Sequence, residues 1–248
     1  MGDKYAEESM RDSSAEVTGE THERQYRTYK DCFLKRSLGP HEWKPAYGGR
    51  IHEPYDAHNR LENEAVSLRF IKSNTNIPVP KVLSTYVHKG SFYLWTELLP
   101  GVSMSKLSPP DQATVILEVE EHLRTLHGLR SNTIGGPTGL ICPPIRAVDV
   151  FDSDKKWVAQ SSPTDDFVFC HNDLSQHNIM VNPDTLRITG ILDWESAGYF
   201  PPFFEAPFFR SPRPSGAQVR DMEDNNAQLV EFLTVCVLVI VIWEVEPS

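Results

Sequence analysis

The sequence predicts an α+β protein built from two lobes. Strand-like and helix-like segments alternate through the first 100 residues, a long helix follows, and a strand-rich segment with many polar side chains comes later. The Pro100-Gly101 pair separates the first group from the long helix, so the boundary between the lobes is expected there. A chain of 248 residues is long enough to bury a sizeable core, in one large domain or in two lobes.

The first lobe is expected to be small and to follow a polar leader. Residues 1–28 are charged and poor in apolar side chains, so they are predicted to be disordered. Residues 29–100 then form an antiparallel sheet with one helix. The first strand is expected at residues 31–38, and the turn "HKG" joins "KVLSTYV" to a strand at residues 91–101.

The helix of the first lobe is predicted at residues 59–73. Leu61, Ala65 and Leu68 recur at the three-to-four spacing of a buried helix face. Glu64 lies on the same face, where a carboxylate needs either a cationic partner or a wet edge. A buried ion pair and a solvated glutamate at the edge of the apolar stripe both remain open interpretations.

The second lobe, residues 101–248, is expected to be larger and mainly helical, and to carry a hairpin. Ser108 begins a long helix, because "SPPD" has the pattern of a capping box. The apolar run at residues 235–243 has nine residues, whereas about 20 are needed to cross a bilayer. We therefore interpret that run as a buried strand or helix end, and membrane association as the minority alternative.

Composition argues against several classes of protein. The 34 acidic residues outnumber the 24 basic ones, for a formal net charge of -10, whereas a nucleic-acid-binding protein needs a basic face. A cationic small-molecule substrate is compatible with that balance. The four cysteines are scattered without a CxxC pair, which disfavours a disulfide framework. The N-terminus has no signal-peptide pattern, so a cytoplasmic location is expected.

The chemistry is concentrated in "FCHNDLSQHNIMVNPDTLRITGILDW", residues 169–194. His171, Asp173 and Asn178 form the pattern H-x-D-x-x-x-x-N, and Asp193 ends a second apolar strand. The turn "NPDT" folds the two strands into a hairpin, which predicts that Asn178 and Asp193 lie close together. Carboxylate and amide oxygens are ligands suited to magnesium. His171 is expected to support the loop backbone.

This segment resembles the small-molecule kinases of the aminoglycoside phosphotransferase and choline kinase group. "HNDLSQHN" (residues 171–178) matches the catalytic loop, and "ILDWE" (residues 191–195) stands where the metal-binding motif does. "EAVSLRFIKSNTNIPVPKVL" and "LWTELLPGVSM" are similar to the first-lobe helix with its following strand, and to the hinge. The matches run in the right order over roughly residues 31–210, which makes the resemblance specific.

The resemblance implies a protein-kinase-like fold and an ATP- and magnesium-dependent transfer of phosphate to a hydroxyl group of a small molecule. It implies that Asp173 accepts or orients the proton of the substrate hydroxyl, and that Asn178 and Asp193 hold magnesium. Glu64 would pair with Lys35, the candidate for the lysine that contacts the phosphates. The adenine would meet backbone groups of the hinge, at Glu97, Leu98 and Leu99.

Two departures from the group keep a second interpretation open. Only Gly2 and Gly19 precede Lys35, so no glycine-rich phosphate loop is evident, and the leader has too few apolar residues for two strands. Little chain follows Asp193, which is expected of a shortened or diverged, fungal-type member. A catalytically inactive kinase-fold protein that binds a nucleotide or a partner is therefore the alternative to the enzyme. A transition-metal site built on Cys170, His171, Asp173 and His177 is disfavoured, because their spacing does not match a common zinc pattern.

Overall fold

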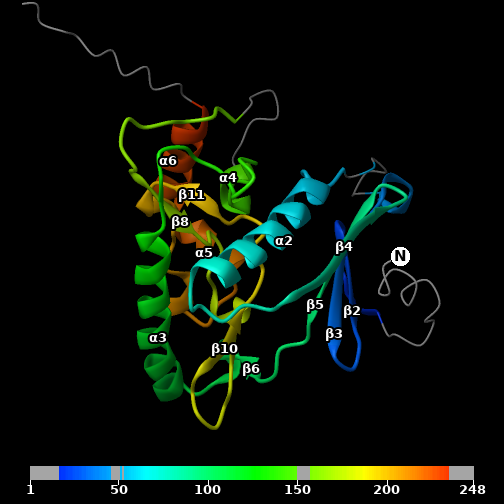
Figure 1. The fold of residues 1–248 in the computed structure, drawn as a ribbon, viewed down its shortest axis with the longest axis vertical. Coiled ribbons are helices and arrows are strands. Elements are labelled where there is room, and N and C mark those ends of the chain that lie inside the picture. The colour runs from blue at the N-terminus through cyan, green and yellow to red at the C-terminus, as the bar shows by residue number, and fades with distance from the viewer. Residues whose placement is uncertain (1–16, 46–50, 52, 150–156, 235–248) are drawn as a thin grey trace, which may run out of the picture.

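In the computed structural model the chain folds into two lobes that meet along helix α2 (Figure 1). Residues 17–45, 51, 53–149 and 157–234 are described. The N-lobe is a five-stranded antiparallel sheet in the order β1-β2-β3-β5-β4. Its strands are β1 (Val17–Glu20), β2 (Arg24–Thr28), β3 (Cys32–Ser37), β4 (Val82–His88) and β5 (Ser91–Glu97).

Strands β1 and β2 correct the expectation of a disordered leader at residues 1–28. They form a hairpin at one edge of the sheet, and the Thr21 hydroxyl accepts hydrogen bonds from the amides of Glu23 and Arg24 in its turn. The low apolar content was misleading, because the buried side chains of β2 are polar. Arg24 and Gln25 are buried there, and a distant carboxylate, Glu195, accepts the hydrogen bond of Arg24 at 2.8 Å. Residues 1–16 lie outside the described residues.

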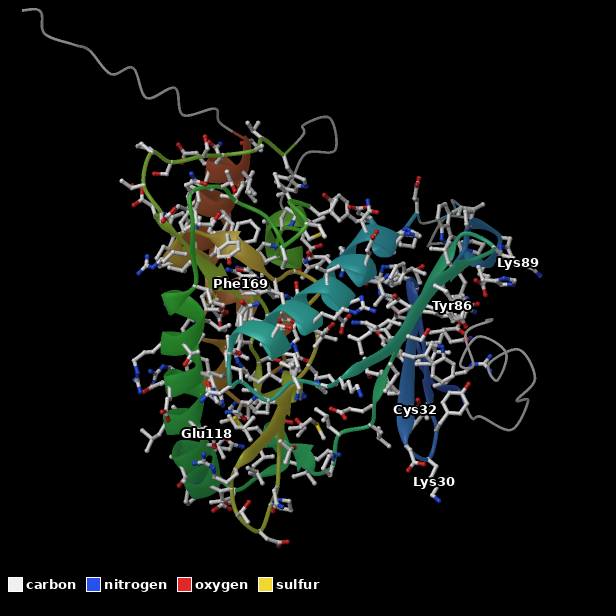
Figure 2. All side chains as sticks on the ribbon, viewed as in Figure 1. Lys30, Cys32, Tyr86, Lys89, Glu118 and Phe169 are labelled. Carbon is white, nitrogen blue, oxygen red and sulfur yellow. The ribbon has the colours of Figure 1, made fainter. Side chains whose placement is uncertain are left out.

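Helix α2 (Ala57–Asn74) confirms the helix predicted at residues 59–73. Its apolar face is buried, with Leu61, Ala65 and Leu68 each at most 1% exposed. The opposite side of the helix packs on the second lobe, since the half-buried ring of Phe70 stacks on Phe169 of β8 with centroids 5.2 Å apart. Figure 2 shows Phe169 between α2 and the long helix α3.

The C-lobe contains both strands and helices. Strand β9 (Ile179–Val181) lies between β10 (Ile188–Ile191) and β6 (Val102–Ser103), and β8 (Phe167–Cys170) lies between β11 (Gly198–Phe200) and β7 (Arg130–Ser131). The α-helices are α3 (Pro109–Gly128), α4 (Ile145–Val148), α5 (Ser215–Gln218) and α6 (Glu223–Thr234). The expectation of a mainly helical C-lobe is therefore not confirmed in the described residues, which form two three-stranded sheets there.

Short 3-10 helices complete the described fold. They are η1 (Pro40–Glu42), η2 (Met104–Lys106), η3 (Gln176–Asn178), η4 (Pro202–Phe204), η5 (Phe208–Arg210) and η6 (Val219–Asp221). Helix α3 begins as the capping box predicts, because the Ser108 hydroxyl caps the Asp111 amide. No described helix has both the length and the apolarity to cross a membrane, and residues 235–243 lie outside the described residues.

The two lobes share one core and a tight connection. A single cluster of buried side chains includes Leu61 of α2, Leu94 of β5, Val119 of α3 and Trp194. The chain crosses between lobes at residues 98–101, where Gly101 has φ +110°. A Cβ atom at Gly101 would lie 2.3 Å from the carbonyl oxygen of Val181, so the connection is held against the β9–β10 hairpin. This contact fixes one side of the cleft between the lobes.

Candidate active site

The predicted catalytic loop begins where the buried strand β8 ends. His171 is fully buried, and its Nε2–H donates to the carbonyl oxygen of Leu192 at 2.9 Å, while its Nδ1 accepts from the amide of Asp173 at 3.2 Å. Burial lowers the pKa of His171 to about 4, so the ring is neutral and one tautomer satisfies both bonds. The expected role of His171, support of the loop backbone, is confirmed by these two contacts.

Asn178 connects the catalytic loop to the hairpin. Its amide nitrogen donates to the backbone carbonyl of Asp173 at 2.9 Å and to Oδ2 of the same residue at 3.2 Å. The hairpin of β9 and β10 forms as predicted, and the amide of Leu192 donates to the carbonyl of Asn178 at 2.8 Å. Because the nitrogen of the Asn178 side chain is occupied by Asp173, its Oδ1 is the atom left for a cation.

Lys35 forms the ion pair predicted with Glu64 and a second one with Asp193. The Lys35 Nζ atom lies 2.7 Å from Glu64 Oε2 and 2.5 Å from Asp193 Oδ1. Burial alone would lower the pKa of Lys35, but the charges of Asp193 and Glu64 outweigh it and raise that pKa well above its ordinary value. The glutamate on the apolar face of α2 is therefore buried and paired rather than solvated.

Asp193 is held in an unusual backbone conformation. Its φ is +66°, a left-handed value that few residues other than glycine, asparagine and aspartate adopt. Trp194 is fully buried behind it, and the indole N–H donates to the carbonyl of Ile191 at 2.9 Å. The buried indole explains why tryptophan follows the aspartate, since the ring anchors the turn that directs the carboxylate toward Lys35.

A cavity of about 290 Å³ lies between the lobes and collects the side chains predicted to bind nucleotide and metal. Its lining includes Lys35, Glu64, Glu97, Leu99, Asn178 and Asp193. Apolar side chains from both lobes, among them Phe33, Leu94 and Leu192, line the remainder of the cavity. An apolar cleft that carries charged groups at one end suits a ligand with a flat base and a charged tail.

The backbone amides of the predicted hinge, residues 97–99, differ in whether they already have a hydrogen-bond partner. The Glu97 amide donates to the carbonyl of Lys81 at 3.0 Å, and its carboxylate accepts from the Lys81 amide at 2.8 Å. The Leu98 amide donates to the carbonyl of Asp31 at 3.2 Å. The amides of Glu97 and Leu98 are thus occupied by the residues that precede β4 and β3. Among the amides of residues 97–99, that of Leu99 is therefore the candidate contact in this part of the cavity.

Leu99 is placed by a glycine in the facing hairpin. A Cβ atom at Gly190 of β10 would lie 2.1 Å from Cδ1 of Leu99. The side chain of Leu99 therefore occupies the space that any larger residue at position 190 would need, and the absence of a side chain there lets the hinge approach the hairpin closely.

A buried cluster of charges that the sequence analysis did not predict lies next to Lys35. Glu195 accepts hydrogen bonds from Arg24 of β2, at 2.8 Å, and from Arg60 of α2, and its carboxylate lies 3.8 Å from Lys35 Nζ. Burial would raise the pKa of Glu195, but Lys35, Arg60 and Arg24 together hold it well below its usual range. The carboxylate of Glu195, in the turn after Asp193, thereby connects that turn to β2 through Arg24 and to α2 through Arg60.

Asp173 lines a second cavity, of about 210 Å³, which is distinct from the interlobe cavity of about 290 Å³ that contains Lys35. Its lining includes Arg60, Glu195 and Ser215, and Phe208 contributes an aromatic wall. Burial, followed by the nearby charge of Asp193, raises the pKa of Asp173 to about 6. A carboxyl group with a pKa of about 6 that lines a cavity is placed to exchange a proton with a ligand bound there.

The loop that carries Asp173 is braced from below by two buried groups. The Glu205 carboxylate accepts hydrogen bonds from the amides of His171, at 2.5 Å, and of Asn172, at 3.2 Å. The Arg146 guanidinium donates to the carbonyls of Asn172, at 3.0 Å, and of Phe204, at 2.5 Å. Both side chains come from segments far from residue 173 in the sequence, so the loop is held by tertiary contacts.

Some of these additional residues had a recognisable sequence signal and others did not. Arg60 lies four residues before Glu64, which is one helical turn, so it shares the face of α2 that meets the cleft. Glu195 follows Asp193 by two positions within "ILDWE". Arg24 lies in the segment expected to be disordered, and nothing local distinguishes Glu205 or Arg146.

Comparison with known sequences extends the resemblance on which the site was predicted. Residues 142–225 match the model of the phosphotransferase enzyme family. An aminoglycoside 3'-phosphotransferase of Streptomyces ribosidificus is 28% identical over 168 residues, which is 56% of this chain and 60% of that protein. An aminoglycoside 3'-phosphotransferase of Streptomyces fradiae is 27% identical over 185 residues, 65% of this chain and 69% of that protein. The chain thus spans about 60% to 69% of the length of these relatives.

Comparison with solved structures supports the fold over most of the chain. An aminoglycoside phosphotransferase from Streptomyces rimosus, solved in complex with ADP and streptomycin, superimposes with a TM-score of 0.54 at 18% identity, covering 93% of this chain and 92% of that one. Another structure of the protein from the same organism gives a TM-score of 0.57 at 17% identity, covering 91% and 88% of the two chains. The predicted kinase-like fold is confirmed, and so is the resemblance to aminoglycoside phosphotransferases.

Proposed function

We propose that this chain, as a relative of the aminoglycoside phosphotransferases, transfers the terminal phosphoryl group of ATP to a hydroxyl group of a small molecule, with magnesium. The observation that carries the proposal is the convergence on Lys35. Its ammonium contacts Glu64 at 2.7 Å and Asp193 at 2.5 Å inside one cavity, and Asn178 lines the same cavity. Phosphoryl transfer requires mainly alignment of the reactants and neutralisation of phosphate charge, and this arrangement supplies groups for both.

The donor atoms near Asp193 fit magnesium. Asp193 offers a carboxylate, and the side chain of Asn178 has its nitrogen turned to Asp173, so that its amide oxygen is available. Oxygen ligands of this kind, few in number and supplemented by water and phosphate, are those that magnesium uses in kinases. When bound, the metal would neutralise phosphate charge; Asn178 and Asp193 would hold it.

Lys35 and the hinge would contact different parts of the nucleotide. Lys35 would donate to phosphate oxygens, and Glu64 would keep its ammonium in place from the opposite side. The base would lie on the apolar part of the cavity, where the backbone at Leu99 offers hydrogen-bonding groups; Glu97 would contribute through its packing and its contact with Lys81. This division places the charged tail beside Asp193 and the flat base at the hinge.

Asp173 would act on the acceptor. Its raised pKa, about 6, suits a group that takes a proton from a substrate hydroxyl near neutral pH. The neighbouring cavity of about 210 Å³ would hold the part of the acceptor that bears this hydroxyl. Aminoglycosides are the first candidates for the acceptor, because the relatives are named for them and because this chain carries a formal net charge of -10 against their positive one.

One observation favours the alternative, a kinase-fold protein that binds without catalysis. The turn between β1 and β2 stands before the lysine strand, where related kinases carry a glycine-rich phosphate loop, and here it contains Glu23. The Glu23 carboxylate pairs with Arg60 at 2.9 Å, next to the cluster around Glu195. A carboxylate in this turn opposes the approach of phosphate, and its ion pair with Arg60 reduces that repulsion.

Calorimetric titration of AMP-PNP, with and without magnesium, tests the nucleotide site. The enzyme interpretation expects saturable binding that strengthens with magnesium, and expects Asp193→Ala to abolish that strengthening. Asp184→Asn, at an exposed position in the β9–β10 turn, is the matched control and should bind as the wild type does. The inactive alternative would be favoured if the affinity for AMP-PNP were the same with and without magnesium and in Asp193→Ala, and if no phosphate were transferred to any of a panel of amino sugars and choline-like alcohols.

A further inference from the structure

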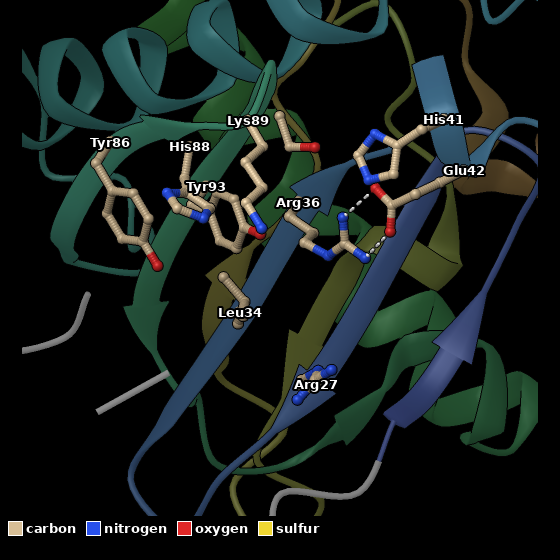
Figure 3. A pocket seen from close by; sticks show the side chains of 10 residues that line it. Arg27, Leu34, Arg36, His41, Glu42, Tyr86, His88, Lys89 and Tyr93 are labelled. Carbon is tan, nitrogen blue, oxygen red and sulfur yellow. Dashed lines mark hydrogen bonds and ion pairs between the residues drawn. The ribbon is translucent and has the colours of Figure 1, made fainter. Parts of the chain in front are cut away.

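A third cavity lies on one face of the N-lobe sheet, and the interlobe cavity lies on the opposite face. Successive side chains of a strand point to opposite faces, so Lys35 enters the interlobe cavity while Leu34 and Arg36 face away from it. These two side chains line a separate cavity of about 200 Å³ (Figure 3). The cavity is closed on one side by η1 and on another by the turn between β4 and β5.

The register of the sheet builds the wall of this cavity. Gln25 pairs with Arg36, Arg36 pairs with Tyr93, and Tyr93 pairs with Tyr86, so the four side chains form one row across β2, β3, β5 and β4. The rings of Tyr86 and Tyr93 stack with centroids 4.7 Å apart and planes 12° from parallel. The stacked rings face one another, so the row presents aromatic edges beside a guanidinium group.

Arg36 is fixed and largely neutralised. Its two terminal nitrogens donate to the Glu42 carboxylate at 2.7 Å and 2.6 Å, its Nε donates to Gln25 at 3.1 Å, and its Cζ lies 5.8 Å from the centroid of Tyr93. The bidentate pair lowers the pKa of Glu42 to about 2, so its charge cancels that of Arg36 at neutral pH. The cavity wall is thus rigid before any ligand binds.

Two further cations line the cavity without such a partner. Arg27 donates from Nε to Gln25 at 3.3 Å, and neither Arg27 nor Lys89 forms an ion pair with an acidic side chain among the described residues. Figure 3 shows Arg27 and Lys89 toward opposite ends of the cavity, with Leu34 and Arg36 between them. Two positive charges that have no ion pair within the described part of the chain therefore flank an apolar and aromatic middle, in a protein whose overall charge is -10.

We propose that this cavity, defined by Leu34, Arg36, Tyr93, Arg27 and Lys89, binds a small aromatic anion, such as an aryl carboxylate or an aryl phosphate. The ring of the ligand packs on Leu34 and against the edge of Tyr93, and the positive charges of Arg27 and Lys89 at the two ends of the cavity favour an anion. The volume of about 200 Å³ limits the ligand to one or two fused rings with a single anionic group. Because the sheet separates this cavity from the interlobe cleft, nucleotide and anion bind without competing.

Titration of the full chain with 1-naphthoate, followed by calorimetry, tests the proposal. We expect one saturable site for 1-naphthoate in the presence and in the absence of AMP-PNP. The neutral analogue 1-naphthalenemethanol, which keeps the rings, and acetate, which keeps the charge, are expected to bind much more weakly than 1-naphthoate.

The variants place the binding in this cavity. The double variant Arg27→Gln/Lys89→Gln removes both positive charges that favour an anion in this cavity and should weaken 1-naphthoate binding by about tenfold or more. Tyr86→Leu, which removes the stacked partner of Tyr93, should also weaken it. Lys72→Gln/Arg124→Gln makes the same change in net charge on exposed helical positions and should alter the affinity by less than about twofold. Equal affinity in the two double variants, or displacement of 1-naphthoate by AMP-PNP, would overturn the proposal.

Discussion

The ammonium of Lys35 lies 2.5 Å from the carboxylate of Asp193, so the two groups that kinases direct at phosphate and metal are joined here in an ion pair. Glu64 holds the same ammonium from the other side at 2.7 Å. A magnesium–nucleotide complex would replace this pair, because its phosphates would compete for Lys35 and its metal for Asp193. In the structure, Lys35, Glu64 and Asp193, which are proposed to act on nucleotide and metal, are therefore already close together and neutralise one another's charge.

Replacement of Lys35 tests that arrangement. Lys35→Met removes the cation that faces phosphate and leaves the carboxylates of Glu64 and Asp193 unpaired, so we expect AMP-PNP binding to weaken by about tenfold or more. Lys72→Met, on the exposed side of α2, is the matched control and should leave the affinity unchanged. The measurement is calorimetric, at fixed magnesium. Unchanged affinity in Lys35→Met would remove Lys35 from the nucleotide site.

The activity should depend on pH through Asp173. Its pKa is raised to about 6 in the folded protein, and it can accept a proton only as the carboxylate. Turnover is therefore expected to be full above that pH and to fall about tenfold for each pH unit below it. The rate of phosphate transfer, measured across pH 5 to 8, checks this. A rate that stays level as the pH falls through 6 would contradict the role of Asp173 as the base.

The cluster around Glu195 should contribute strongly to stability. Glu195→Gln leaves Arg24 and Arg60 without the buried carboxylate, and breaking a buried pair of this kind costs about 3–5 kcal/mol in free energy of unfolding. Glu120→Gln breaks the exposed pair with Arg210 and should cost no more than about 1 kcal/mol. Urea unfolding of the two variants gives both values. Comparable small losses would show that the Glu195 cluster is not a structural clamp.

The same cluster predicts the direction of acid sensitivity. The pKa of Glu195 lies below its unfolded value, so its contribution to stability is complete above the unfolded pKa, near 4.5, and is lost as the pH falls below that value. Unfolding midpoints of wild type and Glu195→Gln should therefore converge as the pH is lowered from neutrality. A constant difference between them at all pH values would contradict this linkage.

The hinge glycine gives a test of the connection between the lobes. Gly101→Ala places a Cβ 2.3 Å from the carbonyl oxygen of Val181 at a φ of +110°, so we expect a loss of about 2 kcal/mol or more in the free energy of unfolding. Gly128→Ala is the control, because a Cβ there meets nothing within 4 Å and alanine favours the helix end. Thermal unfolding should separate the two variants clearly. A stable Gly101→Ala would show that the hinge can move away from the hairpin.

Local patterns in the sequence were sufficient for some elements. The spacing of Leu61, Ala65 and Leu68 predicted α2, and the turn "NPDT" predicted the hairpin that brings Asn178 to the same cavity as Asp193. In these two cases the physical requirement lies within a short stretch of chain. The apolar face around Glu64 left both a buried ion pair and a solvated carboxylate open, and the resemblance to the kinase group was needed to name Lys35 as the partner.

Other features depend on partners distant in the sequence. The β1–β2 hairpin carries few apolar residues and is completed by the contact of Arg24 with Glu195, 171 positions away. The support of the catalytic loop by Glu205 is equally nonlocal. Periodicity reports which face of an element is buried, but it does not report which charges meet there. The contact of the Glu97 carboxylate with the amide of Lys81, which precedes β4, is nonlocal as well and could not be predicted from periodicity.

The most direct test of the proposed function is the Asp173→Asn variant, measured for both nucleotide binding and phosphate transfer. The substitution keeps the shape of the side chain and removes its capacity to accept a proton. The proposal predicts that magnesium-dependent AMP-PNP binding is retained while transfer to an accepted hydroxyl substrate falls by about 10²- to 10⁴-fold. Asp184→Asn, in the exposed β9–β10 turn, should match the wild type in both measurements. Transfer by Asp173→Asn at the wild-type rate, or background transfer in all three proteins across the substrate panel, would contradict the proposal.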